Sequence, residues 1–123
     1  MKITTFDPIL ITSRFDDAVN VFEGLGFQKT HAPVTDTGTT EVRSYRMKDE
    51  NGFHIDISDV KTVERDTQYI RMNVDDFDAA YAILKEHGFT NKRGDDTLDT
   101  NHAKEATMIS PSGYTIALIQ HIK

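Results

Sequence analysis

The sequence predicts an α+β protein made of two tandem βαβββ modules that form curved mixed sheets with a concave ligand cleft. The first observation is that FDDAVNVFEGLGF, starting at Phe15, reappears as FDAAYAILKEHGF, starting at Phe77. The second is a pair of blocks, DENGFHIDI at 49–57 and SPSGYTIAL at 110–118, one after each copy. Because repetition at about half the chain length indicates a duplicated unit, the same elements are expected twice.

The first module is expected to span about 1–60. A β-rich run from Ile3 to Thr12 predicts a strand. Apolar residues from Phe15 to Leu25 recur at helical spacing, and Gly26 is placed to end that helix. The elements expected after it are an extended run at 28–34, a polar loop at 35–40, a strand at 41–48, a tight turn at 49–52 and a strand at 53–58.

The second module, about 66–123, repeats this order and completes a single domain. Asp75 or Asp76 is expected to cap its helix, and Gly88 to end it. The expected elements are a strand at 69–74, a helix at 77–87, an extended run at 90–93, a polar loop at 94–101 and strands at 105–109 and 114–121. The loop at 94–101 is interpreted either as a solvated segment or as a lid.

Composition narrows the classes of function. The net charge is −6 without a long run of like charge, so no nucleic-acid partner is expected. There is no cysteine, which excludes disulfides and thiolate metal sites. The apolar stretch at 9–11 is too short for a signal peptide or a spanning helix, so no membrane partner and a cytoplasmic location are expected.

The repeated pattern resembles the vicinal oxygen chelate superfamily, which contains glyoxalase I, extradiol dioxygenases, fosfomycin-resistance enzymes and bleomycin-resistance proteins. The blocks Leu25-Gly26-Phe27 and His87-Gly88-Phe89, with the Gly-ending turns 49–52 and 110–113, carry the resemblance over essentially the whole chain. It implies metal ligands on the first and last strands of each module. The matching positions here are Asp7, Asp56, Tyr69 and Ala117.

Those four positions offer two carboxylates, a phenol and a methyl group. A catalytic divalent site generally needs three nitrogen or oxygen ligands. An alanine donates nothing, and a phenol with a pKa near ~10 is a poor ligand at neutral pH. No complete metal site and no cofactor are therefore expected; if a divalent metal is bound, Asp7 and Asp56 are its expected ligands.

Strand alternation predicts which side chains line the cleft. A symmetric turn at 49–52 would place Tyr45 opposite Asp56, although a bulge would exchange the faces. Arg71 is interpreted either as a structural ion-pair partner of Asp56 or Glu41 or as the anchor of an anionic ligand, and His54 either as structural or as an acid–base group. The expected ligand-binding residues are His54, Asp56, Tyr45, Tyr69, Arg71, Asn73, Met108 and Ala117.

Two hypotheses of function follow. The first is a glyoxalase/bleomycin-resistance-like protein of unassigned substrate, which binds a small organic molecule in the cleft without a complete metal site. The second is a divalent-metal-dependent lyase, isomerase or dioxygenase of the same superfamily. A homodimer is expected in either case, because an apolar wall of a half-open sheet would otherwise stay exposed.

Overall fold

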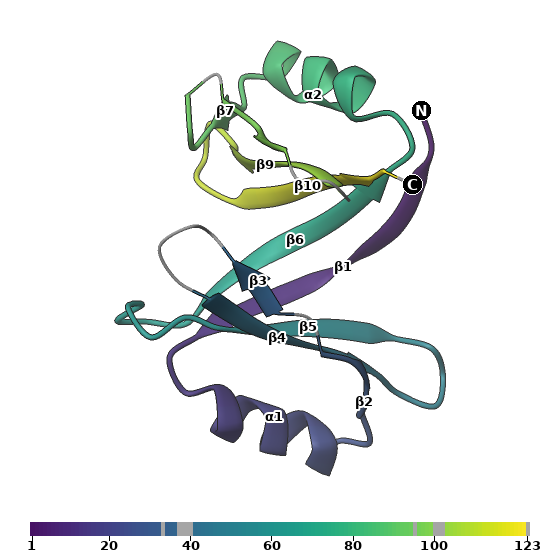
Figure 1. The fold of residues 1–123 in the computed structure, drawn as a ribbon, viewed down its shortest axis with the longest axis vertical. Coiled ribbons are helices and arrows are strands. Elements are labelled where there is room, and N and C mark those ends of the chain that lie inside the picture. Colours follow the sequence, from purple (N-terminus) through teal and green to yellow (C-terminus); the bar gives the residue numbers. More distant parts are fainter. Residues whose placement is uncertain (33, 37–40, 95, 100–102, 123) are drawn as a thin grey trace. The chain divides into compact units, whose positions relative to one another are not determined.

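The computed structural model of the protein describes residues 1–32, 34–36, 41–94, 96–99 and 103–122. Its elements follow the order β1-α1-β2-β3-β4-β5 and then β6-α2-β7-β8-β9-β10, which confirms the predicted α+β class (Figure 1). Part of the loop interpreted as a lid, at 95 and 100–101, lies outside the described residues. No helix in the described part of the chain is long and apolar enough to cross a membrane.

The chain divides into two compact units. The N-terminal unit is Asp7–Gln68, and the C-terminal unit combines Met1–Phe6 with Tyr69–Lys123. The first six residues thus group with the second half of the sequence, because the start of β1 neighbours β6 in the sheet. The backbones of Lys2 and Asp75 hold this pairing, since the Asp75 N–H donates to the Lys2 carbonyl at 3.1 Å.

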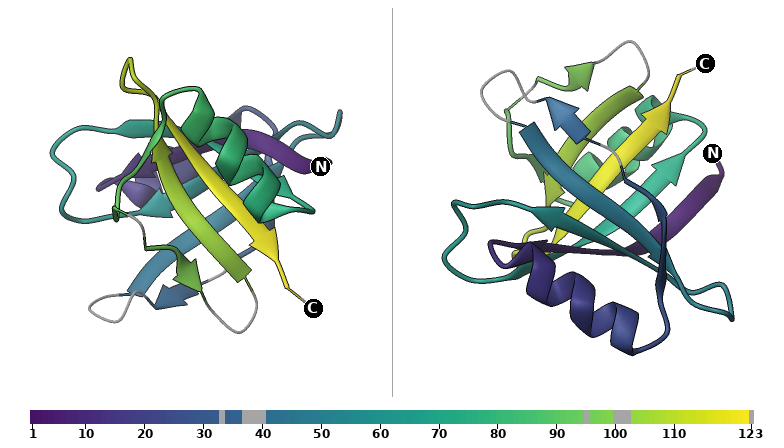
Figure 2. Two further views of the ribbon diagram at one scale, coloured as in Figure 1. Left: turned by 90° about the horizontal axis from the view of Figure 1, so that it is seen from above. Right: turned by 60° about the horizontal axis from the view of Figure 1, so that its bottom comes forward.

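The N-terminal unit is a sheet with α1 packed on one face, which Figure 2 shows in its right-hand view. The sheet order is β2-β4-β5-β1 with β3 beside β4; β1 and β5 are parallel and the other pairs antiparallel. The core between helix and sheet is Phe15, Val19, Met47, Ile55 and Ile57. The elements are β1 (Ile3–Thr12), α1 (Phe15–Gly24), β2 (Gln28–His31), β3 (Val34–Asp36), β4 (Glu41–Lys48) and β5 (His54–Asp59).

The C-terminal unit repeats this design with α2 against its own sheet (Figure 2, left). The order is β6-β10-β9-β7 with β8 beside β9, and β6 and β10 are parallel. Asp76 caps α2 as expected, because its side chain accepts a hydrogen bond from the Ala79 N–H at 3.1 Å. The elements are β6 (Thr67–Val74), α2 (Phe77–Glu86), β7 (Thr90–Asn91), β8 (Leu98–Asp99), β9 (Ala103–Ile109) and β10 (Thr115–His121). The core is Met72, Val74, Phe77, Ala80, Phe89, Ala106, Met108, Ile116 and Leu118.

The last hairpin of the N-terminal unit has a three-residue connection. Asp49 pairs with Phe53, since the Asp49 N–H donates to the Phe53 carbonyl at 3.0 Å, so Lys48 lies opposite His54. Gly52 has a φ of +88°, the left-handed conformation that ends a three-residue hairpin loop. The Asp49 carboxylate accepts hydrogen bonds from the N–H groups of Asn51 and Phe53 at 3.0 and 2.8 Å.

The equivalent hairpin of the C-terminal unit has the same geometry with a different acceptor. The Ser110 N–H donates to the Tyr114 carbonyl at 2.8 Å, and Thr115 lies opposite Ile109. The Ser110 hydroxyl accepts from the N–H groups of Gly113 and Tyr114, both at 3.0 Å. In both units the hairpin register is one residue away from that of a symmetric four-residue turn.

Candidate functional site

Each sheet has one face against its helix and one face opposite it, and the opposite faces carry most of the predicted site residues. In the N-terminal unit, Ile9 of β1 pairs with Asp56 of β5 in parallel register, so Asp7 and Asp56 share the face opposite α1. The Asp56 side chain is 5% exposed, and its Oδ1 accepts from Arg46 Nε at 3.2 Å. His54 is exposed at the start of β5 on this same face.

The donors at the four ligand positions do not fit a divalent metal. Asp56 is held by a guanidinium, which competes with a cation for the carboxylate. Ala117 has no donor atom, and neighbours Arg71 of β6. Across the described ranges of the chain, no three His, Asp or Glu side chains are grouped so that they could hold a metal ion. Two carboxylates and a phenol, which is a poor ligand at neutral pH, therefore do not supply the three good nitrogen or oxygen ligands of a catalytic divalent site.

In the C-terminal unit, the face of the sheet opposite α2 is here called the C-terminal face. One row across its three strands is Arg71 on β6, Ala117 on β10 and Thr107 on β9. The next row is Asn73, Ile119 and Glu105 in the same strand order. Tyr69 lies on the same face two residues before Arg71, because side chains alternate along a strand.

The polar groups of the C-terminal face are held together and partly shielded from water. Arg71 Nε donates to Asn73 Oδ1 at 3.2 Å, which orients the guanidinium along the strand. Asn73 is 5% exposed, whereas Arg71, Tyr69 and Glu105 are half-buried. Burial raises the pKa of Glu105 above its ordinary 4.5, and the positive charge of Arg71 opposes that rise. A cation and a carboxyl group that is costly to ionise thus share one face.

Two predicted site residues are placed wrongly by the symmetric-turn assumption. Tyr45 pairs with Ile57 instead of Asp56 and faces α1, where its ring lies edge-on to Phe15 with centroids 4.8 Å apart. Met108 pairs with Ile116 and is fully buried in the core beneath α2. Both errors have the same cause, since a three-residue connection shifts the pairing by one residue and turns every side chain of β4 and β9 to the other face.

The same shift brings residues to these faces that the sequence analysis did not single out. Arg46 lies opposite Asp56, and Ser44 Oγ lies 2.9 Å from Ser58 Oγ. Glu105 and Thr107 lie on this face of β9 in place of the expected Met108. The signal that could have found them is the Gly at the end of each turn block, which is typical of three-residue hairpins with a left-handed last residue.

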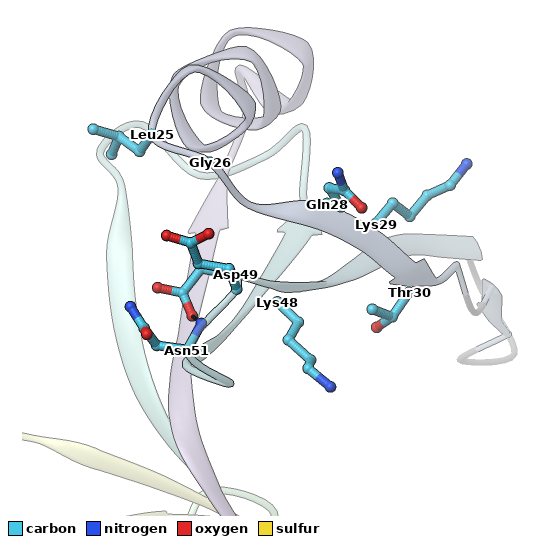
Figure 3. Close-up of a pocket in the computed structure, with 9 residues that line it drawn as sticks. Leu25, Gly26, Gln28, Lys29, Thr30, Lys48, Asp49 and Asn51 are labelled. Atoms are coloured by element: carbon cyan, nitrogen blue, oxygen red, sulfur yellow. Dashed lines mark hydrogen bonds between the residues drawn. The ribbon is translucent and has the colours of Figure 1, made fainter.

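A surface cavity of about 600 Å³ lies between the end of α1 and the β4–β5 turn. It is lined by Leu25, Gly26, Gln28, Lys29, Thr30, Lys48, Asp49, Glu50 and Asn51. Figure 3 shows that Lys29 and Lys48 extend in different directions. Asp49 is engaged in the hydrogen bonds of the turn. Lys29 and Lys48 therefore do not converge on one group of a ligand.

No protein-family model and no curated protein matches the sequence. Solved structures do match it in three dimensions. A methylmalonyl-CoA epimerase has a TM-score of 0.68 and 20% identity over 100% of this chain and 99% of its own. A variant of the Streptomyces coelicolor methylmalonyl-CoA epimerase, in complex with 2-nitronate-propionyl-CoA, has a TM-score of 0.69 and 14% identity over 99% and 100%. A glyoxalase/bleomycin resistance protein/dioxygenase superfamily member from Vibrio splendidus 12B01 has a TM-score of 0.64 and 14% identity over 98% of this chain and 100% of its own.

The chain has the vicinal oxygen chelate fold. The resemblance drawn from the repeated blocks is thereby confirmed at the level of the fold. At 14–20% identity, the vicinal oxygen chelate structures do not carry their activities or ligands over to this chain. Its chemistry has to be argued from its own side chains.

Proposed function

We propose that this is a glyoxalase/bleomycin-resistance-like protein that binds a small organic molecule and has no complete metal site. The observation that carries the proposal is the C-terminal face, where Arg71, Asn73 and Thr107 surround the small side chain of Ala117. A few polar groups set among apolar ones are typical of small-molecule sites. The complex of the Streptomyces coelicolor epimerase with 2-nitronate-propionyl-CoA supports small-molecule binding on this fold.

The proposed binding residues are those of the sequence prediction that face away from the helices. They are His54 and Asp56 in the N-terminal unit and Tyr69, Arg71, Asn73 and Ala117 in the C-terminal unit. The proposal also includes a single functional domain, a homodimer, a cytoplasmic location and no nucleic-acid or membrane partner. The exposed side chains of Phe6 (64%) and Phe53 (67%) support a homodimer, because large exposed apolar residues often mark interfaces.

The test is a screen of small organic molecules by thermal shift in excess EDTA. A genuine ligand is expected to keep its affinity in EDTA and to bind at least about tenfold more weakly to Arg71→Ala, since a charge-assisted hydrogen bond contributes roughly 1.5–3 kcal/mol. Tyr69→Ala, which removes a ring and a hydroxyl from the same face, should also weaken binding. Arg65→Ala, which removes an exposed arginine outside the site, is the control. Equal binding to all three variants would show that the C-terminal face is not the site.

The alternative is a divalent-metal-dependent lyase, isomerase or dioxygenase. It is favoured by one observation, namely that Asp7 and Asp56 share a face of the N-terminal unit. Elemental analysis of protein purified without chelator or histidine tag decides between the two. Stoichiometric zinc, nickel, manganese or iron that is lost in Asp56→Ala would establish the metal-dependent function.

A further inference from the structure

We propose that the molecule bound at the C-terminal face is an organic acid, and that Glu105 takes up a proton when the acid's carboxylate binds Arg71. The inference rests on the proposed function, because it names the ligand class of the same site. It adds a chemical requirement, one negative charge on the ligand, and a measurable consequence, the coupling of binding to pH.

Arg71 lies beside a small side chain on the C-terminal face. Arg71 and Thr107 flank Ala117 in one row of the sheet, and the alanine side chain ends at Cβ. Asn73 holds the guanidinium through Nε at 3.2 Å. A guanidinium fixed in this way is suited to a planar carboxylate, which it can bind through two parallel hydrogen bonds.

The same face also has an apolar part. Ala117 and Ile119 are consecutive same-face residues of β10, and Ile109 lies opposite Thr115 on the neighbouring strand. These side chains suit the hydrocarbon body of a ligand whose charged end lies at Arg71. The face therefore matches an organic acid better than inorganic phosphate or a purely polar molecule.

Glu105 interacts electrostatically with Arg71. It lies in the row next to Arg71, on the far side of Ile119 from Asn73. Arg71 lowers the pKa of Glu105 while burial raises it, so the ionised form of Glu105 depends on the arginine. A carboxylate bound to Arg71 would share that positive charge and add a negative one, and both changes favour protonated Glu105.

The other groups near Glu105 define the controls. Within the C-terminal unit, Ile119 of β10 lies directly opposite Glu105. His121 lies on the same face, two residues after Ile119. Asp99 of β8 pairs with Lys104 of β9, and Lys104 faces α2 and not the C-terminal face. On β9 itself, the same-face neighbours are Ala103 and Thr107. His121 is therefore the second group whose titration has to be separated from that of Glu105.

The experiment is an NMR titration of the whole protein with benzoate and with its neutral analogue benzamide, at several values between pH 5.5 and 8. Benzoate is expected to shift the amide signals of Arg71, Asn73 and Ala117. It should bind at least about tenfold more tightly than benzamide, and Arg71→Ala should remove that preference. The affinity for benzoate should fall as the pH rises, by at most about tenfold per pH unit for one proton.

Three variants identify the titrating group. Glu105→Gln should make the benzoate affinity independent of pH, because glutamine cannot release a proton. Glu86→Gln, an exposed residue of α2, and His121→Gln should keep the wild-type pH profile. A pH profile that survives Glu105→Gln, or one that His121→Gln abolishes, would overturn the role of Glu105.

The two levels of the proposal fail in different ways. If benzamide binds as tightly as benzoate, and both are lost in Tyr69→Ala, the site binds organic molecules but the acid requirement is wrong. If neither molecule shifts the signals of the C-terminal face while a hit of the thermal-shift screen does, the acid requirement is again wrong and the proposed function stands. If no screened molecule shifts these signals, the proposed function and the inference both fall.

Discussion

Two neighbouring residues of β9 illustrate how strongly side-chain direction decides chemistry. Lys104 faces α2, where its Nζ lies 3.0 Å from Asp78 Oδ1 and 5.1 Å from the centroid of the Phe77 ring. The hydrogen bond to Asp78 raises the pKa of Lys104 and favours its charged form. Glu105 faces the other way, and there burial raises its pKa and disfavours its charged form. Both pKa values are raised, but at neutral pH only the shift at Glu105 lowers the free energy of unfolding.

The first prediction concerns Glu105 in the protein without ligand. Its pKa is higher in the folded than in the unfolded state, so the folded state holds the proton more tightly. The free energy of unfolding is therefore expected to decline as the pH rises from about 4.5 through the raised pKa of the folded state. Glu105→Gln should remove this part of the decline, as measured by urea unfolding at several pH values. Glu86→Gln is the control, and an unchanged slope in Glu105→Gln would contradict the prediction.

At the scale of the element, alternation within one strand was a safer guide than the pairing between strands. Alternation along β5 places Ile55 and Ile57 on the face away from Asp56, and alternation along β6 places Met72 on the face away from Arg71, and all three pack in the cores beneath the helices. The faces of β4 and β9 were inferred from the partner strands β5 and β10 by assuming a symmetric turn. That prediction was wrong for Tyr45 and Met108. Backbone hydrogen bonds within the turn set the register of the hairpin. In the sequence, the main sign of these bonds is the Gly at the end of the turn.

The helix ends offer a prediction that uses the internal repeat as its own control. Gly26 and Gly88 follow α1 and α2 with φ values of +101° and +90°, so an alanine at either is strained by roughly 1–2 kcal/mol. At Gly88 a Cβ would also lie 2.9 Å from Pro111 Cγ, whereas at Gly26 it meets nothing within 4 Å. Gly88→Ala should therefore lower the free energy of unfolding more than Gly26→Ala, as measured by urea unfolding.

Removing the proline ring separates the two contributions. Pro111→Ala should reduce the cost of Gly88→Ala and leave that of Gly26→Ala unchanged, since only the contact at Gly88 is relieved. Equal costs for the two glycine substitutions, with or without Pro111, would show that backbone strain alone matters.

At the scale of the whole molecule, the duplication predicted the elements but not how the chain is shared between the units. The two modules are expected to meet between about 60 and 66, and β6, which contributes to the sheet of the C-terminal unit, begins at Thr67. However, β1 contributes its first residues to the C-terminal unit and Asp7–Thr12 to the N-terminal unit. A β-rich run predicts a strand without saying which neighbours it has, because pairing depends on residues far along the chain. For Ala117 the prediction about metal binding depended only on its side chain, because a methyl group cannot bind a metal whichever face of the sheet it occupies.

The third prediction tests the attachment of the first six residues. The Lys2 N–H donates to Asp75 Oδ1 at 2.6 Å, in addition to the backbone bond between the same residues. Asp75→Ala should destabilise this attachment by about 0.5–1.5 kcal/mol and speed hydrogen exchange in residues 1–6 and at the end of β6. Exchange in β4 and β5 should stay unchanged. Asp96→Ala, also an exposed aspartate of the C-terminal unit, is the control, and identical exchange in the two variants would contradict the prediction.

The pairing of Lys2 with Asp75 also has a consequence for the order of folding. These residues are 73 positions apart, so Lys2 can meet its partner only after the residues up to Asp75 have been synthesised. Closing so long a loop costs conformational entropy before its contacts form, which slows folding. In the N-terminal unit, β1 pairs with β5 of the same unit, so this unit can form before residues 1–6 have paired. The pairing of residues 1–6 with the end of β6 would then be the last step in the folding of the C-terminal unit.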